Sequence, residues 1–346
     1  MAKCNDYYYN LLPREMKQVY YAIYEALSKQ ETSFSAPRMA DKDFYRIYFM
    51  VRLDHPEIFY STRFSYRFYE HADNMEVIPE YMFNGSKLKS HIQAMDARVR
   101  KLARAAEKMN EKEKEKYIHD FICDSVTYDK LKKDYSHEII GPLGNGVGVC
   151  EGIAKTVKIL CDALGVWCII ALSEANPEKG IKYRHAWNVI KIDGKYYHLD
   201  VTFDNSLSKD GVVRYDYFNL PDVQIQRDHE RYVYSLPECK DGKSTYYIEK
   251  KLSFTKEEDV RKRALQAAKK GKVLVFHWRG GYLTKEKVLE FFDIFKEEGE
   301  KKGKFANVSL NWAQAVFKVY YTDLEGTAEV AMEEANEGEL YDGEQN

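Results

Sequence analysis

The sequence predicts an α+β fold whose core is one helix packed on an antiparallel sheet. The first observation is an amphipathic helix that begins at Cys150 and is expected to end at Gly165 in a left-handed cap. Its apolar stripe consists of Ile153, Val157, Leu160 and Leu164. The second observation is Asp193-Gly194, a dipeptide typical of a two-residue hairpin turn, between two strand-like segments. The third is a separate series of helix and strand patterns after residue 222.

Residues 1–110 are expected to form a mainly helical N-terminal region. Apolar side chains recur at helical spacing in three of its segments, 12–27, 41–53 and 86–108. Ser86 is expected to cap the third of these helices. Two further segments, 63–69 and 76–83, are typical of a pair of strands, and 33–37 is expected to be a loop.

Residues 111–221 are expected to form the central domain, beginning with a helix that starts at Asn110. A glycine-rich loop over 130–149 then leads to Cys150. A phosphate-binding loop is the competing interpretation, but no Gly-Lys-Ser/Thr follows the glycines. The predicted strands cover 167–174, 183–190 and 195–202, and the predicted loops cover 176–182 and 205–215.

Residues 222–324 are expected to form a small α+β domain. Its helices are expected to begin with a capping box of Thr255 and Glu258 and with a cap at Thr284. Its strands are expected at 272–278, 307–312 and 315–321. The run His277-Trp278-Arg279-Gly280-Gly281 is a candidate for lining a surface site, the alternative being a strand end and a turn. Residues 325–346 are acidic and poor in apolar groups, which predicts a disordered tail.

Composition narrows the class of protein. The 346 residues are 45% hydrophobic and 31% charged, with a formal net charge of −2, and basic residues alternate with acidic ones. This pattern argues against a nucleic-acid partner. The six cysteines lack metal-site spacing, so neither a metal nor an organic cofactor is expected. No apolar stretch is long enough for a membrane span, and no signal peptide is seen. We therefore expect a cytoplasmic protein as the chain stands, or an exported one if a signal has been trimmed.

Cys150 is a candidate nucleophile because it lies in the first turn of its predicted helix. Unpaired N–H groups and the positive end of the helix dipole favour a thiolate there. The alternative is that Cys150 packs in the core as a small hydrophobic residue, as expected for Cys161 and Cys168.

The hairpin turn places a histidine beside a carboxylate. With Asp193-Gly194 as the turn, Trp187 is expected to pair with Asp200 and His185 with Thr202. His185 and Asp200 would then be diagonal neighbours on one face of the sheet, where longer side chains reach each other. A thiol, an imidazole and a carboxylate together provide a nucleophile, a base and an orienting group.

Three motifs carry a resemblance to a known family: Val149-Cys150-Glu151-Gly152-Ile153-Ala154, His185-Ala186-Trp187-Asn188 and Tyr197-His198-Leu199-Asp200-Val201-Thr202-Phe203-Asp204. Over about residues 112–205 the chain resembles the bacterial transglutaminase-like domain. More narrowly it resembles the branch related to the cytokinesis protein 3 transglutaminase/protease-like proteins, although Ile153 stands where that branch often carries Tyr. The resemblance implies a papain-like site with Cys150 as nucleophile, His185 as base and Asp200 as orienting carboxylate.

The resemblance implies acyl transfer or hydrolysis at a peptide or carboxamide bond, as in a thiol peptidase, an amidase or a transglutaminase. Hydrolysis is slightly favoured because water needs no second binding site. One alternative is a non-catalytic module that binds a protein or a cell-wall peptide in the same cleft. Another is an arylamine-type N-acetyltransferase, which uses the same triad. Each hydrolase, transglutaminase or binding hypothesis implies a protein or peptide partner.

Other residues near the predicted site are candidates for substrate or oxyanion contacts. The backbone N–H of Cys150 is a natural oxyanion donor. The further candidates are Tyr128, Asn145, Glu151, Gly152 and Trp187. Trp187 is expected to shield the site beside the histidine and the aspartate.

Overall fold

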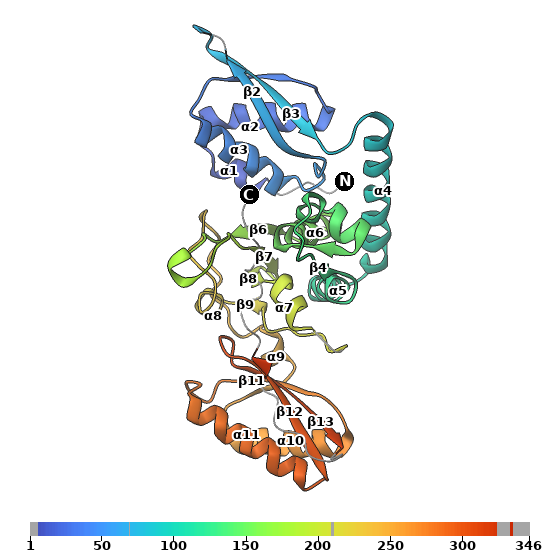
Figure 1. Ribbon diagram of the computed structural model, residues 1–346, viewed down its shortest axis with the longest axis vertical. Helices are drawn as coiled ribbons and strands as arrows, with labels where there is room; N and C mark the ends of the chain where they lie inside the picture. Colours follow the sequence, from blue (N-terminus) through green and yellow to red (C-terminus); the bar gives the residue numbers. More distant parts are fainter. Residues whose placement is uncertain (1–5, 69, 209–210, 324–332, 335–346) are drawn as a thin grey trace. The chain divides into compact units, whose positions relative to one another are not determined.

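The computed structural model describes residues 6–68, 70–208, 211–323 and 333–334, which form two compact units (Figure 1). The first unit comprises the described residues within 1–174, 184–213 and 232–238, and the second comprises those within 175–183, 214–231 and 239–346. Both units combine helices with sheets, which confirms the predicted α+β class. The N-terminal region and most of the predicted central domain lie in one unit, so the predicted division at residue 110 remains a hypothesis.

The N-terminal part of the first unit packs helices around a small antiparallel sheet. The helices of this part are α1 (Tyr7–Leu11), α2 (Arg14–Lys29) and α3 (Asp41–Asp54). The next helix, α4 (Gly85–Ala106), packs on the helix that begins at Cys150. The strands are β1 (Phe34–Pro37), β2 (Ser61–Phe68) and β3 (Asn74–Tyr81), in the order β1-β3-β2. The prediction of a loop at 33–37 was wrong. These residues form β1, which pairs antiparallel with β3, with Phe34 opposite Val77 and Pro37 opposite Asn74.

The remainder of the first unit holds the helix that begins at Cys150 and the sheet that supports it. Its elements are α5 (Glu111–Ser125), β4 (Thr127–Tyr128), η1 (Asp134–His137), η2 (Gly141–Asn145), β5 (Val147–Gly148), α6 (Cys150–Ala163), β6 (Cys168–Leu172), β7 (Ala186–Ile192), β8 (Lys195–Leu199) and α7 (Val201–Leu207). Strands β6, β7 and β8 pair antiparallel in sequence order. Helix α6 packs on β6 and β7, as Figure 1 shows.

Several predicted boundaries shift for local reasons. The strand expected at 195–202 ends at Leu199, because the side chain of Asp200 accepts hydrogen bonds from the next backbone N–H groups and begins α7. Helix α7 also replaces the start of the loop expected at 205–215. The predicted cap at Ser86 is wrong, since α4 begins at Gly85. The loop at 130–149 contains η1, η2 and β5. Asn110 caps α5 through a full capping box with Glu113.

The second unit contains its own sheet and hydrophobic core. Its principal elements are α10 (Glu257–Lys270), α11 (Lys285–Glu300), β10 (Ser253–Phe254), β11 (Leu274–Trp278), β12 (Lys304–Asn311), β13 (Val316–Asp323) and β14 (Glu333–Glu334). The short elements are η3 (Pro177–Lys179), β9 (Phe218–Leu220), α8 (Asp222–Ile225) and α9 (Tyr246–Glu249). The strands of its five-stranded sheet are ordered β10-β11-β13-β12-β14.

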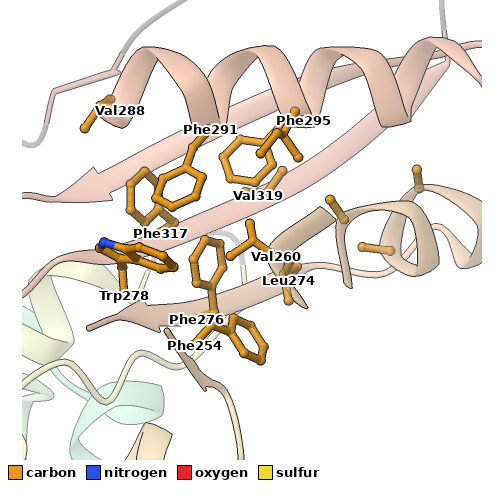
Figure 2. Packing of buried hydrophobic residues seen from close by; sticks show 14 of the residues in the cluster. Phe254, Val260, Leu274, Phe276, Trp278, Val288, Phe291, Phe295, Phe317 and Val319 are labelled. Carbon is orange, nitrogen blue, oxygen red and sulfur yellow. The ribbon is translucent and has the colours of Figure 1, made fainter. Parts of the chain in front are cut away.

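Aromatic side chains fill that core between the sheet and its two long helices (Figure 2). Phe276 and Phe317 stack with their ring centroids 5.2 Å apart, and Phe291 lies edge-on to both. Thr284 caps α11 as predicted, whereas the capping box at Thr255 was wrong because α10 begins after Lys256 without a side-chain cap.

The tail expected at 325–346 lies outside the described residues except for β14, which pairs with β12.

Candidate active site

Cys150 is the first residue of α6, and its side chain is half-buried. The preceding residue, Val149, has no polar side chain that could cap the helix. The first-turn N–H groups of α6 have no intrahelical acceptor, as at any helix start, and no side chain at Val149 caps them. The segment just before Cys150 is strand β5, which pairs with β4 and places Gly148 opposite Tyr128.

Close packing explains why glycines flank the thiol. A Cβ on Gly148 would lie 2.8 Å from the ring of Pro142 in η2. A Cβ on Gly152 would overlap the carbonyl oxygen of Ser136 in η1. The same carbonyl accepts a hydrogen bond from Val149 N at 3.0 Å. These glycines let two loops close tightly around the start of α6.

The hairpin turn has the predicted geometry, with φ of +49° at Asp193 and +79° at Gly194. Ile192 pairs with Lys195, as expected, and the regular ladder continues to Asn188 opposite Leu199. The expected continuation to Trp187–Asp200 and His185–Thr202 is wrong, because the chain enters α7 after Leu199. His185 and Asp200 thus lie just beyond the two strands rather than on them.

The structure nevertheless brings His185 and Asp200 together. Nε2 of His185 lies 2.6 Å from Oδ2 of Asp200, and both side chains are buried. Oδ1 of Asp200 accepts hydrogen bonds from the backbone N–H groups of Thr202 at 2.9 Å and Phe203 at 3.1 Å. One carboxylate oxygen therefore caps α7 while the other holds the imidazole.

Two aromatic rings fix the plane of the His185 ring. Trp187 stacks on it, with centroids 5.8 Å apart and an interplanar angle of 14°, and Phe203 packs against it at 4.7 Å. Trp187 is itself held by a hydrogen bond from Nε1 to Nδ1 of His198 at 2.9 Å. Tyr232 extends this series of side-chain contacts, with its hydroxyl 3.3 Å from Nε2 of His198. Since Trp187 is only 1% exposed, it supports His185 and offers little surface to a ligand.

Charge around His185 favours the protonated ring. Burial alone disfavours the imidazolium, but the charge and hydrogen bond of Asp200 and a hydrogen bond with Cys150 outweigh it and raise the pKa of His185 to about 10. Because Asp200 occupies Nε2, Nδ1 is the ring nitrogen left for the thiol. The arrangement therefore places a protonated imidazole between the sulfur of Cys150 and the carboxylate of Asp200.

The other predicted site residues are placed differently. Tyr128 is half-buried on β4, next to the approach to Cys150. Asn145 ends η2, and its side-chain Nδ2 donates to the carbonyl of Ile140 at 3.1 Å. Its amide therefore holds the local turn. Glu151 points into an ion-pair cluster, and Gly152 serves the close packing described above.

Sequence reasoning missed that ion-pair cluster, which lies directly beside the nucleophile helix. Nζ of Lys155 lies 2.7 Å from a carboxylate oxygen of both Glu151 and Glu138, and Arg52 of α3 pairs with both acids. Burial opposes ionisation of Glu151, but Lys155, a hydrogen bond from His137, and Arg52 together lower its pKa well below the usual range. Only the four-residue spacing of Glu151 and Lys155 was visible in the sequence.

Comparison with known proteins identifies the domain that contains these residues. Residues 99–201 match the family described as the transglutaminase-like superfamily. The chain contains a transglutaminase-like domain. The matched segment runs from the end of α4 to the start of α7 and includes Cys150, His185 and Asp200. The narrower branch suggested by the motifs remains a prediction. No curated protein matches the chain significantly.

Solved structures similar to the chain include a TGase, at 14% identity over 41% of this chain and 44% of that one, with a TM-score of 0.29. Another is a candidate cysteine protease from Cytophaga hutchinsonii, at 16% identity over 44% and 62%, with a TM-score of 0.27. A third is a candidate protease from Parabacteroides distasonis, at 15% identity over 40% and 36%, with a TM-score of 0.25. The chain thus spans less than two thirds of each of these proteins.

Each helix among the described residues is too short or too polar to cross a bilayer.

Proposed function

We propose that the transglutaminase-like domain is a thiol enzyme that transfers or hydrolyses an acyl group at a peptide or carboxamide bond. The observation that carries the proposal is the arrangement of His185, held at Nε2 by buried Asp200 and hydrogen-bonded to Cys150. A packing cysteine would not need an imidazole oriented toward it in this way. The start of α6 adds N–H groups where an oxyanion would form.

In the proposed reaction, the Cys150 thiolate attacks the carbonyl carbon and forms a tetrahedral intermediate. The backbone N–H of Cys150 stabilises the oxyanion. The His185 imidazolium gives its Nδ1 proton to the leaving amine or ammonia, and an acyl-thioester remains on Cys150. His185 then removes a proton from the acceptor, which attacks the thioester, and the Cys150 thiolate leaves beside the re-formed imidazolium.

The acceptor decides the outcome of the reaction. Water as the acceptor gives a peptidase or an amidase, and a lysine amine gives cross-linking. Hydrolysis is our preferred assignment, because the site geometry accounts for the nucleophile and base without a second substrate. The binding-module hypothesis predicts no covalent intermediate, and the acetyltransferase hypothesis predicts an acetylated thiol.

The test is to incubate the protein with a mixed peptide pool, with and without a primary amine, and to follow products by mass spectrometry. Cleavage or ammonia release supports hydrolysis, and a mass gain equal to the amine minus ammonia supports transglutamination. Turnover should vanish in Cys150→Ala and persist in Cys123→Ser, a control at another half-buried cysteine. Identical product traces from wild type and Cys150→Ala would reject the enzymatic proposal.

A further inference from the structure

A groove in the second unit has an excess of positive charge. Its volume is about 480 Å³, and all of its lining residues lie between 248 and 279. Its cations are Lys251, Lys262, Arg263 and Arg279, and its one anion is Asp259. Four positive charges and one negative charge leave a formal +3 in the lining.

Helix α10 forms one wall of the groove, with Asp259, Lys262, Arg263 and Gln266 on one face. Arg261, on another face of the same helix, pairs with Glu297 at 2.5 Å and Glu298 at 2.9 Å. In contrast, within the described part of the chain no ion pair joins any of the four groove cations to a carboxylate. Their charge is therefore available to a ligand.

Arg279 is held in position from within the unit. Its Nε donates to Oγ of Ser253 at 3.1 Å, and that oxygen lies 3.0 Å from Nδ1 of buried His277. Burial, followed by the charges of Arg227 and Arg279, lowers the pKa of His277 to about 4. The neutral ring can then accept the Ser253 hydroxyl proton, while Ser253 accepts from Arg279. These hydrogen bonds use only Nε of Arg279, so its terminal nitrogens can contact a ligand.

The groove also has an apolar part. Phe254 and Ile248 contribute to its lining. The Phe254 ring packs against Phe276 with centroids 5.5 Å apart, as Figure 2 shows, so this side of the groove belongs to the hydrophobic core. The volume lies within the usual range of small-molecule sites. The lining is mostly charged and polar, which favours a charged ligand. A nucleic acid would call for a longer basic track.

We propose that this groove binds a small ligand that carries a multivalent oxyanion, either phosphoryl groups or several carboxylates. The planar guanidinium groups of Arg263 and Arg279 suit two-point contacts with such oxyanions, and Lys251 and Lys262 add point charges. This site also gives a role to the His277–Arg279 run noted in the sequence. Binding there is independent of the proposed chemistry at Cys150, so Cys150→Ala should bind equally well.

Isothermal titration of the full chain with pyrophosphate tests the proposal, with sodium chloride used to hold the ionic strength constant. One saturable site is expected, and Arg263→Gln and Arg279→Gln should each weaken binding at least tenfold. Arg261→Gln is the matched control on the same helix, and it should stay within twofold of wild type. A parallel titration with citrate distinguishes the sources: binding of pyrophosphate alone identifies phosphoryl groups, and binding of both identifies a general oxyanion site.

Absence of a saturable signal with either probe would overturn the proposal. An equal loss of affinity in Arg261→Gln and Arg263→Gln would do the same, because it would indicate nonspecific attraction. Thermal melting of each variant checks that it folds. If an arginine variant does not fold, Lys262→Gln, at an exposed position, takes its place in the titration.

Discussion

Replacing Asp200 by asparagine separates the two roles of this carboxylate. In the native structure Oδ1 caps α7 and Oδ2 binds His185. Asparagine is as good a helix cap as aspartate, so its oxygen can keep the bonds to Thr202 and Phe203. Its NH₂ group then faces Nε2 of His185 as a donor. This forces the neutral ring to carry its proton on Nδ1, where it can no longer accept the proton of the thiol.

The expected size of the effect of Asp200→Asn follows from the charge around His185. Its pKa rises from an ordinary value of 6.5 to about 10 through Asp200 and Cys150, against the effect of burial. At 1.36 kcal/mol per pH unit, this is about 5 kcal/mol in favour of the imidazolium. Since Cys150 supplies part of it, Asp200→Asn should slow alkylation of Cys150 at pH 6 by between about tenfold and about 10³-fold.

The same substitution should change how stability depends on pH. Because the folded pKa of His185 is raised, its stabilising contribution is complete below about pH 6.5 and is lost as pH rises toward about 10. Urea unfolding at pH 6 and pH 9.5 measures this dependence. The free energy of unfolding should fall less between these pH values in Asp200→Asn than in wild type. Asp200→Ala should lose a further 1 kcal/mol or so at both pH values, because the cap is also removed. An Asp200→Asn protein with the alkylation rate and pH profile of wild type would refute this reasoning.

Three further outcomes are expected. Iodoacetamide at pH 6 should modify Cys150 well before the buried thiol of Cys161, as read by peptide mass spectrometry; equal rates would contradict an activated thiol. Gly194→Val should lower the free energy of unfolding by about 1–2 kcal/mol, because φ is +79° there, whereas Gly194→Asn should cost less; equal stability of both variants would contradict the turn argument. Lys155→Met should destabilise the protein by about 3–5 kcal/mol, because it leaves the buried carboxylate of Glu138 and the half-buried one of Glu151 with too little positive charge. Lys29→Met, at an exposed ion pair, is the control and should leave the denaturation midpoint unchanged.

Local chemistry made much of the site predictable. The helix beginning at Cys150 follows from its apolar stripe, and the register beside Asp193-Gly194 follows from the positive φ that this turn requires. These two features, read from short stretches of sequence, predicted that His185 and Asp200 would meet. The predicted strand position of Asp200 was wrong, because this residue caps α7, but its side chain still reaches His185.

Tertiary structure decided what depends on partners distant in the sequence. The strand β1 forms because β3 offers its edge to residues 34–37, and no local pattern marks that pairing. The charges of Arg52 and Glu138 meet Glu151 and Lys155 only after α3 and the 134–140 segment close over α6. Such contacts are set by packing between elements, whereas turns, caps and helix stripes are set by backbone geometry within a few residues.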